Sequence, residues 1–197
     1  MAKTMRKNWP IWSAIALLTF VSPFAARAEP TQGSSVIVFG GQMTDNDWQE
    51  TFQPSKLEFL DSHFVGIGLG YDWVIGNSRW TLGVEGQVVG HFGRQDHLEF
   101  NLPVVARYHA RRPYLPSFQS VAFGIGLSTT SKKPKIEIDR DGDTTNTLVY
   151  WMLDVEFDLP PPNTSLSFRL HHRSDAFGLF DKDSGSNALA VGIRRRF

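Results

Sequence analysis

Apolar and polar residues alternate with a period of two through most of the chain after Ser34. In the segment 63–75, for example, Val65, Ile67 and Leu69 alternate with glycines. Because successive side chains of a β-strand point to opposite faces, this pattern predicts strands with one apolar face and one face that is charged or very small. Gly, Pro, Asn and Asp separate the segments, as they do in turns. The eight predicted strands are Ser34–Met43, His63–Ile75, Trp80–His91, His97–His109, Phe118–Ser128, Thr147–Leu159, Ser165–Ser174 and Asn187–Phe197.

Two architectures can accommodate such strands. A soluble sandwich or lipocalin-type barrel buries the apolar face and exposes the charged face to water. A membrane barrel turns the apolar face to lipid and keeps the charges in its lumen, and its short periplasmic connections alternate with long external ones. The predicted connections alternate in this way, being short or moderate at 76–79, 111–117 and 160–164 and longer at 44–62, 129–146 and 175–186. The sequence therefore predicts an all-β fold, an eight-stranded antiparallel up-and-down transmembrane β-barrel in the bacterial outer membrane.

The charged faces of the last three predicted strands would line the lumen of such a barrel. An unpaired charge in a dehydrated interior is costly, so these charges must be paired. Asp154 and Glu156 are expected to face basic side chains of the following strands, namely Arg169, His171, Arg173, Arg194 and Arg196. An eight-stranded barrel has interior space only for side chains, and inward-facing glycines are expected to make room for the arginines. These glycines are Gly66, Gly68, Gly70, Gly124 and Gly126.

The first 28 residues have the pattern of a secretory signal peptide. Basic residues come first, an uncharged run extends from Trp9 to Ala26, and Ala26-Arg-Ala28 forms a small-x-small cleavage site. Cleavage would leave one domain, an outer-membrane β-barrel over residues 29–197. A retained membrane anchor is the alternative, but Pro10 and Pro23 bracket a short apolar core.

The predicted mature chain is mildly acidic and contains no cysteine. Four of the twenty Lys and Arg residues lie in the signal segment, which leaves sixteen against twenty Asp and Glu. This balance gives no basic excess for binding nucleic acid. Without cysteine, an exported chain of this size must be stable without disulfides.

The last two predicted strands bring three polar side chains together on the apolar face. His172 and Ser174 share the parity of Leu166 and Phe168, and Asn187 begins the final strand with the same parity. If both termini are periplasmic, these residues meet at the level of the outer leaflet, on the lipid side. A histidine beside a serine can act as its general base, and a third polar group can hold the imidazole in the required tautomer. We therefore interpret His172, Ser174 and Asn187 as candidate catalytic residues.

This hairpin resembles the C-terminal hairpin of the outer-membrane lipid A 3-O-deacylases. The resemblance rests on residues 172–179 (His-Arg-Ser-Asp-Ala-Phe-Gly-Leu) and 184–187 (Ser-Gly-Ser-Asn), where the family has His-x-Ser-Asn-Ala-Gly-Leu and then Gly-x-Glu. It implies an eight-stranded barrel that hydrolyses the acyl ester at the 3 position of lipid A, with Ser174 as nucleophile and His172 as base. No cofactor is implied, because such a triad supplies its own activation.

Two positions depart from the family. Allowing one inserted loop residue, Asn187 stands where the family has its orienting Glu. An amide can orient a histidine but cannot stabilise imidazolium by charge. Asp181 or Asp183 in the loop is an alternative support for His172. Asp175 stands where the family usually has Asn, a change that bears on oxyanion stabilisation.

The predicted function is an outer-membrane esterase that removes an ester-linked acyl chain from lipid A, so the expected partner is the lipopolysaccharide of the outer leaflet. A non-catalytic barrel with a structural or adhesive role in the envelope is the alternative, because polar residues at the rim of a membrane strand also meet head groups. A periplasmic lipid-carrying barrel is a third candidate, and its interior would be apolar. The terminal strand ending at Phe197 resembles the signal read by the outer-membrane assembly machinery, a second expected partner.

Two further patterns do not lead to a metal prediction. Asp139-Arg-Asp-Gly-Asp143 is similar to a calcium-binding loop, but Thr144 and Tyr150 stand where a glycine and the closing glutamate belong. This segment is expected to be an external hairpin. The histidines of the first four strands lack the close spacing of metal ligands, and these are His63, His91, His97 and His109.

Overall fold

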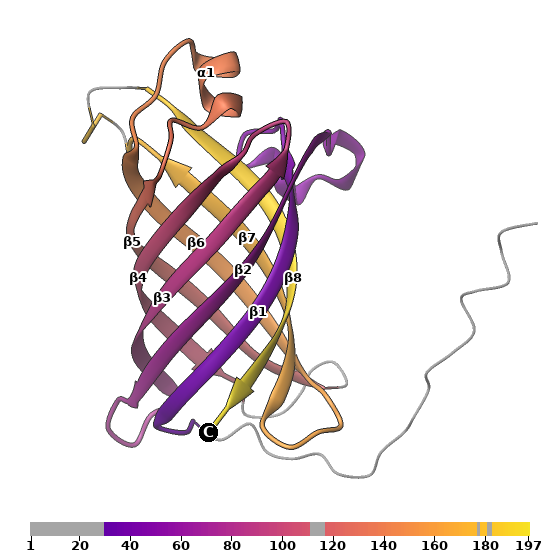
Figure 1. Cartoon of the computed structure of the whole chain (residues 1–197). Helices are drawn as coiled ribbons and strands as arrows, with labels where there is room; N and C mark the ends of the chain where they lie inside the picture. Colours follow the sequence, from indigo (N-terminus) through magenta and orange to yellow (C-terminus); the bar gives the residue numbers. More distant parts are fainter. Residues whose placement is uncertain (1–29, 111–116, 177, 181–182) are drawn as a thin grey trace, which may run out of the picture.

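The computed structural model describes residues 30–110, 117–176, 178–180 and 183–197. Eight strands form one closed antiparallel barrel in chain order (Figure 1). The strands are β1 (Gly33–Thr44), β2 (Phe59–Val74), β3 (Trp80–Gly93), β4 (His97–His109), β5 (Phe118–Thr130), β6 (Thr147–Asp158), β7 (Thr164–Ser174) and β8 (Gly185–Arg196). The predicted fold class and all eight predicted strands are confirmed. The largest difference in bounds is that β2 begins at Phe59, four residues earlier than predicted.

Pairing of β1 with β8 closes the barrel, so the sheet has no free edge. Two backbone hydrogen bonds join Ser34 and Phe197 at one end of this seam, at 3.1 and 3.0 Å. Figure 1 shows that the C-terminus and the start of β1 lie at the end of the barrel opposite α1. Because the number of strands is even, the start of β1 and the end of β8 lie at the same end of the barrel, as they must if both termini are periplasmic.

The barrel exposes its apolar side chains and buries its charged ones. Leu69 and Leu102 are 64% and 65% exposed, whereas Asp154 and Glu156 inside the barrel are fully buried. So large a continuous apolar exterior is unfavourable in water and matches the lipid-facing surface of a membrane barrel. The strands, 11 to 16 residues long, exceed the roughly 9–11 residues that a tilted strand needs to cross the hydrocarbon core. No helix among the described residues is long and apolar enough to cross a membrane.

Aromatic side chains gather on the exterior at the end that carries the termini. Tyr71 and Trp73 lie 4.8 Å apart between ring centroids, and Trp80 and Tyr108 lie 5.2 Å apart. Amphipathic rings of this kind are enriched where a membrane meets water. The cluster therefore indicates the level of one membrane interface.

Three of the four connections at the opposite end are long, as predicted. The connection after β1 carries two 3-10 turns, η2 (Glu50–Phe52) and η3 (Pro54–Lys56), and the connection after β5 carries helix α1 (Lys135–Asp141). The exception is the connection between β3 and β4, which contains only residues 94–96. The expectation that 139–143 forms an external hairpin is wrong. This segment ends α1, and Gly142 terminates the helix in the left-handed conformation with φ +83°.

Helix α1 covers the mouth of the barrel rather than projecting into solvent. Ile136 packs with buried lumen residues such as Phe64 and Met43. Glu137 is fully buried and lies 2.7 Å from Arg173 Nε, while Ser186 donates a hydrogen bond to its carboxylate at 2.8 Å. The end of the lumen near the long connections is therefore closed by this segment.

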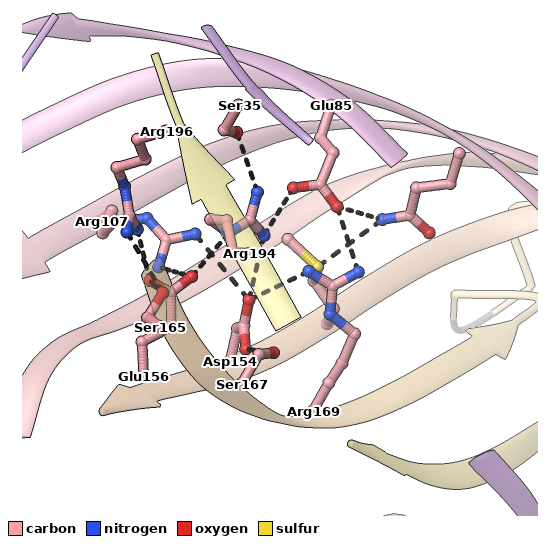
Figure 2. Close-up of polar contacts among 12 residues, drawn as sticks. Ser35, Glu85, Arg107, Asp154, Glu156, Ser165, Ser167, Arg169, Arg194 and Arg196 are labelled. Carbon is pink, nitrogen blue, oxygen red and sulfur yellow. Dashed lines mark hydrogen bonds and ion pairs between the residues drawn. The ribbon is translucent and has the colours of Figure 1, made fainter. Parts of the chain in front are cut away.

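The part of the lumen toward the end that carries the termini contains a network of buried ion pairs (Figure 2). Arg194 lies 2.8 Å from Glu85, 3.3 Å from Asp154 and 2.6 Å from Glu156. Arg169 lies 3.1 Å from Glu85 and 3.0 Å from Asp154. Two further arginines join Glu156, namely Arg107 and Arg196. The predicted pairing of the acids of β6 with arginines of β7 and β8 is confirmed. This buried charged network argues against a lipid-carrying barrel, whose interior would be apolar throughout.

Two predicted lumen partners differ. His171 contacts Glu99 of β4 across the lumen at 3.0 Å, rather than an acid of β6. Arg173 pairs with Glu137 of α1. Both residues lie nearer the long connections than Asp154 does, so they meet the groups that enter from across the barrel and from the covering segment.

The inward glycines make room mainly for apolar side chains, which corrects the expectation that they accommodate arginines. A Cβ atom on Gly66 would lie 2.5 Å from Phe39 Cζ, so the Phe39 ring occupies that space. The Arg169 guanidinium carbon lies over the same ring, 5.0 Å from its centroid. Gly68 and Gly124 similarly face Ile37 and Met152.

Candidate active site

The candidate catalytic residues lie at the end of β7 and the start of β8, near the long connections. His172 and Asn187 are direct cross-strand partners in the β7–β8 register. His172 Nδ1 lies 2.6 Å from Asn187 Oδ1. An amide oxygen can only accept a hydrogen bond, so with this amide orientation Nδ1 carries the ring proton and Nε2 has a free lone pair. The predicted association of these two residues is therefore present in the structure.

Asn187 is itself held in a defined orientation. Its Nδ2 atom donates a hydrogen bond to the backbone oxygen of Asn46 at 2.8 Å. Thr44 Oγ1 donates a hydrogen bond to the backbone oxygen of Asn187 at 3.4 Å. Asn46 belongs to the connection between β1 and β2, whose folding against β8 leaves Asn187 only 3% exposed. Because the amide nitrogen is engaged by a carbonyl, the amide oxygen is the atom turned to His172.

Ser174 is two residues beyond His172 on the same side of β7 and is half-buried. Its side-chain oxygen has no hydrogen bond within the described part of the chain, and the same holds for His172 Nε2. Ser174 and His172 therefore share one side of β7 without a hydrogen bond between them in the described chain. Catalytic hydrogen bonds are often long or unformed before substrate binds, so this geometry keeps Ser174 a candidate nucleophile.

Aromatic rings surround His172 on the outer face of the barrel. Trp151 of β6 packs against the imidazole in a tilted arrangement, with ring centroids 4.5 Å apart and planes inclined by 37°. Trp48 and Phe123 contact the other parts of Trp151, at 5.8 and 6.0 Å. This apolar surface adjoins the polar pair on the side of the barrel that faces lipid, and it suits an acyl chain better than a charged ligand.

Helix α1 also fixes the start of β8. Arg140 donates a hydrogen bond to the backbone oxygen of Gly185, and Asp141 Oδ2 accepts one from Gly185 N at 3.3 Å. Gly185 lies two residues before Asn187. The segment that covers the lumen therefore also positions the strand that carries the orienting amide.

The remaining candidate residues have other roles or lie outside the described residues. Asp175 Oδ2 accepts a hydrogen bond from Gly178 N at 2.6 Å, which stabilises the turn after β7. Asp183 is exposed, and no contact with His172 is present among the described residues. Asp181 lies outside the described residues. Of the three groups proposed to support His172, the structure brings only Asn187 to the imidazole in the described chain.

Sequence reasoning missed Asn46 and Trp48. Both lie in the connection between β1 and β2, which has no period-two pattern. Asn46 is 141 residues from Asn187 in the chain. The closure of β1 on β8 brings them to the site. Barrel closure itself is the signal that would have found them, because it makes the first long connection a neighbour of the last strand.

The closed barrel, its apolar exterior and its ion-paired lumen define the class of this protein, a membrane-spanning β-barrel of the bacterial outer membrane. No family model matches the sequence, and no curated protein matches it. The structure is similar to that of the outer membrane enzyme PagL, with a TM-score of 0.56 and 15% identity over 83% of this chain and 99% of that chain. It is also similar to Neisserial surface protein A, with a TM-score of 0.50 and 14% identity over 84% of this chain and 97% of that chain. At these identities the similarities establish the barrel fold.

Proposed function

We propose that the protein is an outer-membrane esterase that removes an ester-linked acyl chain from lipid A. The 2.6 Å contact between His172 Nδ1 and Asn187 Oδ1 is the observation that carries the proposal. This contact leaves Nε2 as the basic atom of the ring, and Ser174 lies two residues beyond His172 on the same side of β7. The resemblance of this hairpin to the lipid A 3-O-deacylases supports the same assignment.

The proposed reaction has two steps. Ser174 Oγ attacks the ester carbonyl carbon while His172 Nε2 accepts the hydroxyl proton. The imidazolium then gives that proton to the sugar oxygen as the ester C–O bond breaks, so the sugar leaves with a free hydroxyl and the acyl group stays on Ser174. Water next attacks the acyl-enzyme with His172 again as base, which releases the fatty acid and restores Ser174. Asn187 holds the imidazole in the required tautomer but adds no negative charge, so it stabilises the imidazolium less than a carboxylate would.

The test compares lipid A from cells that produce the wild-type protein or its Ser174→Ala variant, with mass spectrometry as the readout. The wild type should convert lipid A to a species that lacks one ester-linked acyl chain, and the variant should not. Ser184→Ala is the matched control, because Ser184 lies in the same hairpin and its hydroxyl has no hydrogen bond within the described chain. Deacylation that persists unchanged in Ser174→Ala would remove the serine mechanism.

The alternative, a non-catalytic barrel with a structural or adhesive role, is favoured by one observation. Ser174 Oγ and His172 Nε2 are not hydrogen-bonded to each other in the described structure. The fold does not choose between the two functions, since an outer membrane enzyme and a surface protein share it. Identical lipid A profiles in cells with and without the wild-type protein would favour this alternative.

A further inference from the structure

A second polar cluster lies inside the barrel, between the arginine network and helix α1. His91 of β3 and His97 of β4 are direct cross-strand partners, and their rings are stacked with centroids 4.3 Å apart. Glu99 is two residues beyond His97 on the same face of β4, and its Oε2 lies 2.8 Å from His91 Nε2. One ligand atom from each of these three buried residues lies within 4.8 Å of the other two. Nothing in the proposed esterase mechanism uses them.

Glu99 differs from the other buried carboxylates in its partners. The carboxylates of Glu85, Glu137, Asp154 and Glu156 each have an arginine within 4 Å. Glu99 instead faces two histidines among the described residues, His91 at 2.8 Å and His171 at 3.0 Å. A buried anion is stable when a cation balances its charge, and Glu99 has no ion pair with an arginine or a lysine among the described residues. The cluster therefore has a place for a positive charge.

His97 provides an independent indication. Its side chain is buried, with only 5% of the residue exposed, yet neither ring nitrogen has a hydrogen-bond partner among the residues that the structure describes. An imidazole nitrogen with an unused lone pair, beside a second imidazole and a carboxylate, is a typical ligand for a divalent transition metal.

We propose that His91, His97 and Glu99 form a binding site for a divalent transition metal ion of the zinc class. Two imidazole nitrogens and one carboxylate oxygen match the ligand preference of Zn²⁺ and leave one coordination position open. A tetrahedral ion with ligand distances of about 2.0–2.1 Å holds its ligand atoms roughly 3.3 Å apart. Small rotations of side chains that now lie within 4.8 Å of one another satisfy this requirement.

The neighbours of the cluster suit the role of supporting groups. Gln95 Nε2 lies 3.2 Å from His91 Nδ1, so this amide helps to hold the His91 ring in place. Ser128 donates a hydrogen bond to Glu99 Oε1 at 3.0 Å, which leaves Oε2 for the metal. Gln95 Oε1 also accepts a hydrogen bond from Ile136 N of α1 at 3.4 Å. The ion would therefore join β3 to β4 beneath the segment that closes the mouth.

The test uses the full-length folded protein in detergent, without an affinity tag, after treatment with a chelator. Titration with Zn²⁺ should show one bound ion per chain, and Co²⁺ should give the strong visible absorption of a tetrahedral site. The His97→Ala variant should lose at least about 100-fold in Zn²⁺ affinity, since even second-shell changes cost 10–100-fold. This variant should fold normally, because it removes no described hydrogen bond.

His109→Ala is the matched control, since His109 is a buried lumen histidine at the opposite end of the same strand. It should bind Zn²⁺ as the wild type does. X-ray absorption of the zinc-loaded wild type should show backscattering from two imidazoles, a result that does not depend on how any variant folds. The proposal fails if the wild type binds no Zn²⁺, if His97→Ala binds it as tightly, or if His109→Ala weakens binding equally.

Discussion

Two neighbouring arginines near the end of the chain have opposite surroundings. Arg194 is 1% exposed and contacts three carboxylates in the lumen. Arg195 is exposed on the outer face, where its guanidinium donates a hydrogen bond to Thr164 Oγ1 at 2.8 Å. Two arginines that are adjacent in the chain therefore have different roles, one in the buried ion-pair network and one on the exposed exterior, because successive residues of a strand face opposite sides.

This contrast leads to a prediction for stability. Arg194→Ala leaves three buried carboxylates with fewer cations and should lower the free energy of unfolding by about 3–5 kcal/mol. Arg195→Ala removes an exposed contact and should change it by less than about 1 kcal/mol. Denaturant titration of the detergent-folded protein, followed by tryptophan fluorescence, measures both. Equal, small effects of the two substitutions would contradict the structural role assigned to the network.

The positions of the lumen charges were predictable from the sequence, but only some of their partners were. Parity alone placed Arg194, Arg169 and Asp154 in the lumen, and the adjacency of β6 and β7 predicted the pair of Arg169 with Asp154. The contact of His171 with Glu99 was not predictable, because partners across a barrel depend on how far the strands are staggered at closure. His172 and Asn187 were predictable as neighbours, since one hairpin connects them.

Helix α1 is an element whose position depends on one buried carboxylate. Glu137 contacts Arg173 at 2.7 Å and accepts hydrogen bonds from Thr144 at 2.6 Å and Ser186 at 2.8 Å. The helix has seven residues and no side-chain cap, so it is too short to be stable by itself. The covering segment is therefore held in the mouth of the barrel by contacts with the lumen.

Removing that carboxylate should loosen the segment. Glu137→Ala should make trypsin cleavage after Lys135 and Arg140 at least about tenfold faster, because loss of charged hydrogen bonds favours local opening. Asp139→Ala is the control in the same helix. This substitution removes the ion pair between Asp139 and Arg94, whose side chains are 34% and 43% exposed respectively. It should leave the cleavage rate nearly unchanged. Equal rates in both variants would show that Glu137 does not hold the helix.

Elements with a period were predictable and elements without one were not. The eight strands follow from alternation, and β4 has the predicted bounds, His97–His109. The segment 139–143 was expected to be an external hairpin, but residues 139–141 form the end of helix α1. Its amphipathic character is visible only after Ile136 and Glu137 are seen to face the lumen. A seven-residue helix is shorter than the window in which helical periodicity can be recognised.

For the whole molecule, the proposed esterase function depends on which face of the sheet meets lipid. The exterior residues Leu69, Leu102 and Val191 are 64%, 65% and 49% exposed, and the lumen contains a network of buried ion pairs (Figure 2). If the exterior lies in hydrocarbon, Ser174 and the rings around His172 lie where the acyl esters of lipid A are found. If it lay in water, the serine would have no such substrate beside it.

Site-directed spin labelling measures this directly, and the lack of cysteine in the chain allows single labels at Leu69→Cys, Val191→Cys and Asn77→Cys. Asn77 lies in the exposed turn between β2 and β3 and serves as the aqueous reference. In protein folded into lipid vesicles, labels at positions 69 and 191 should be relaxed strongly by oxygen and weakly by a water-soluble nickel chelate, with the reverse at position 77. Labels at 69 and 191 that are as accessible to the nickel chelate as the label at 77 would contradict the membrane-spanning barrel and the proposed function with it.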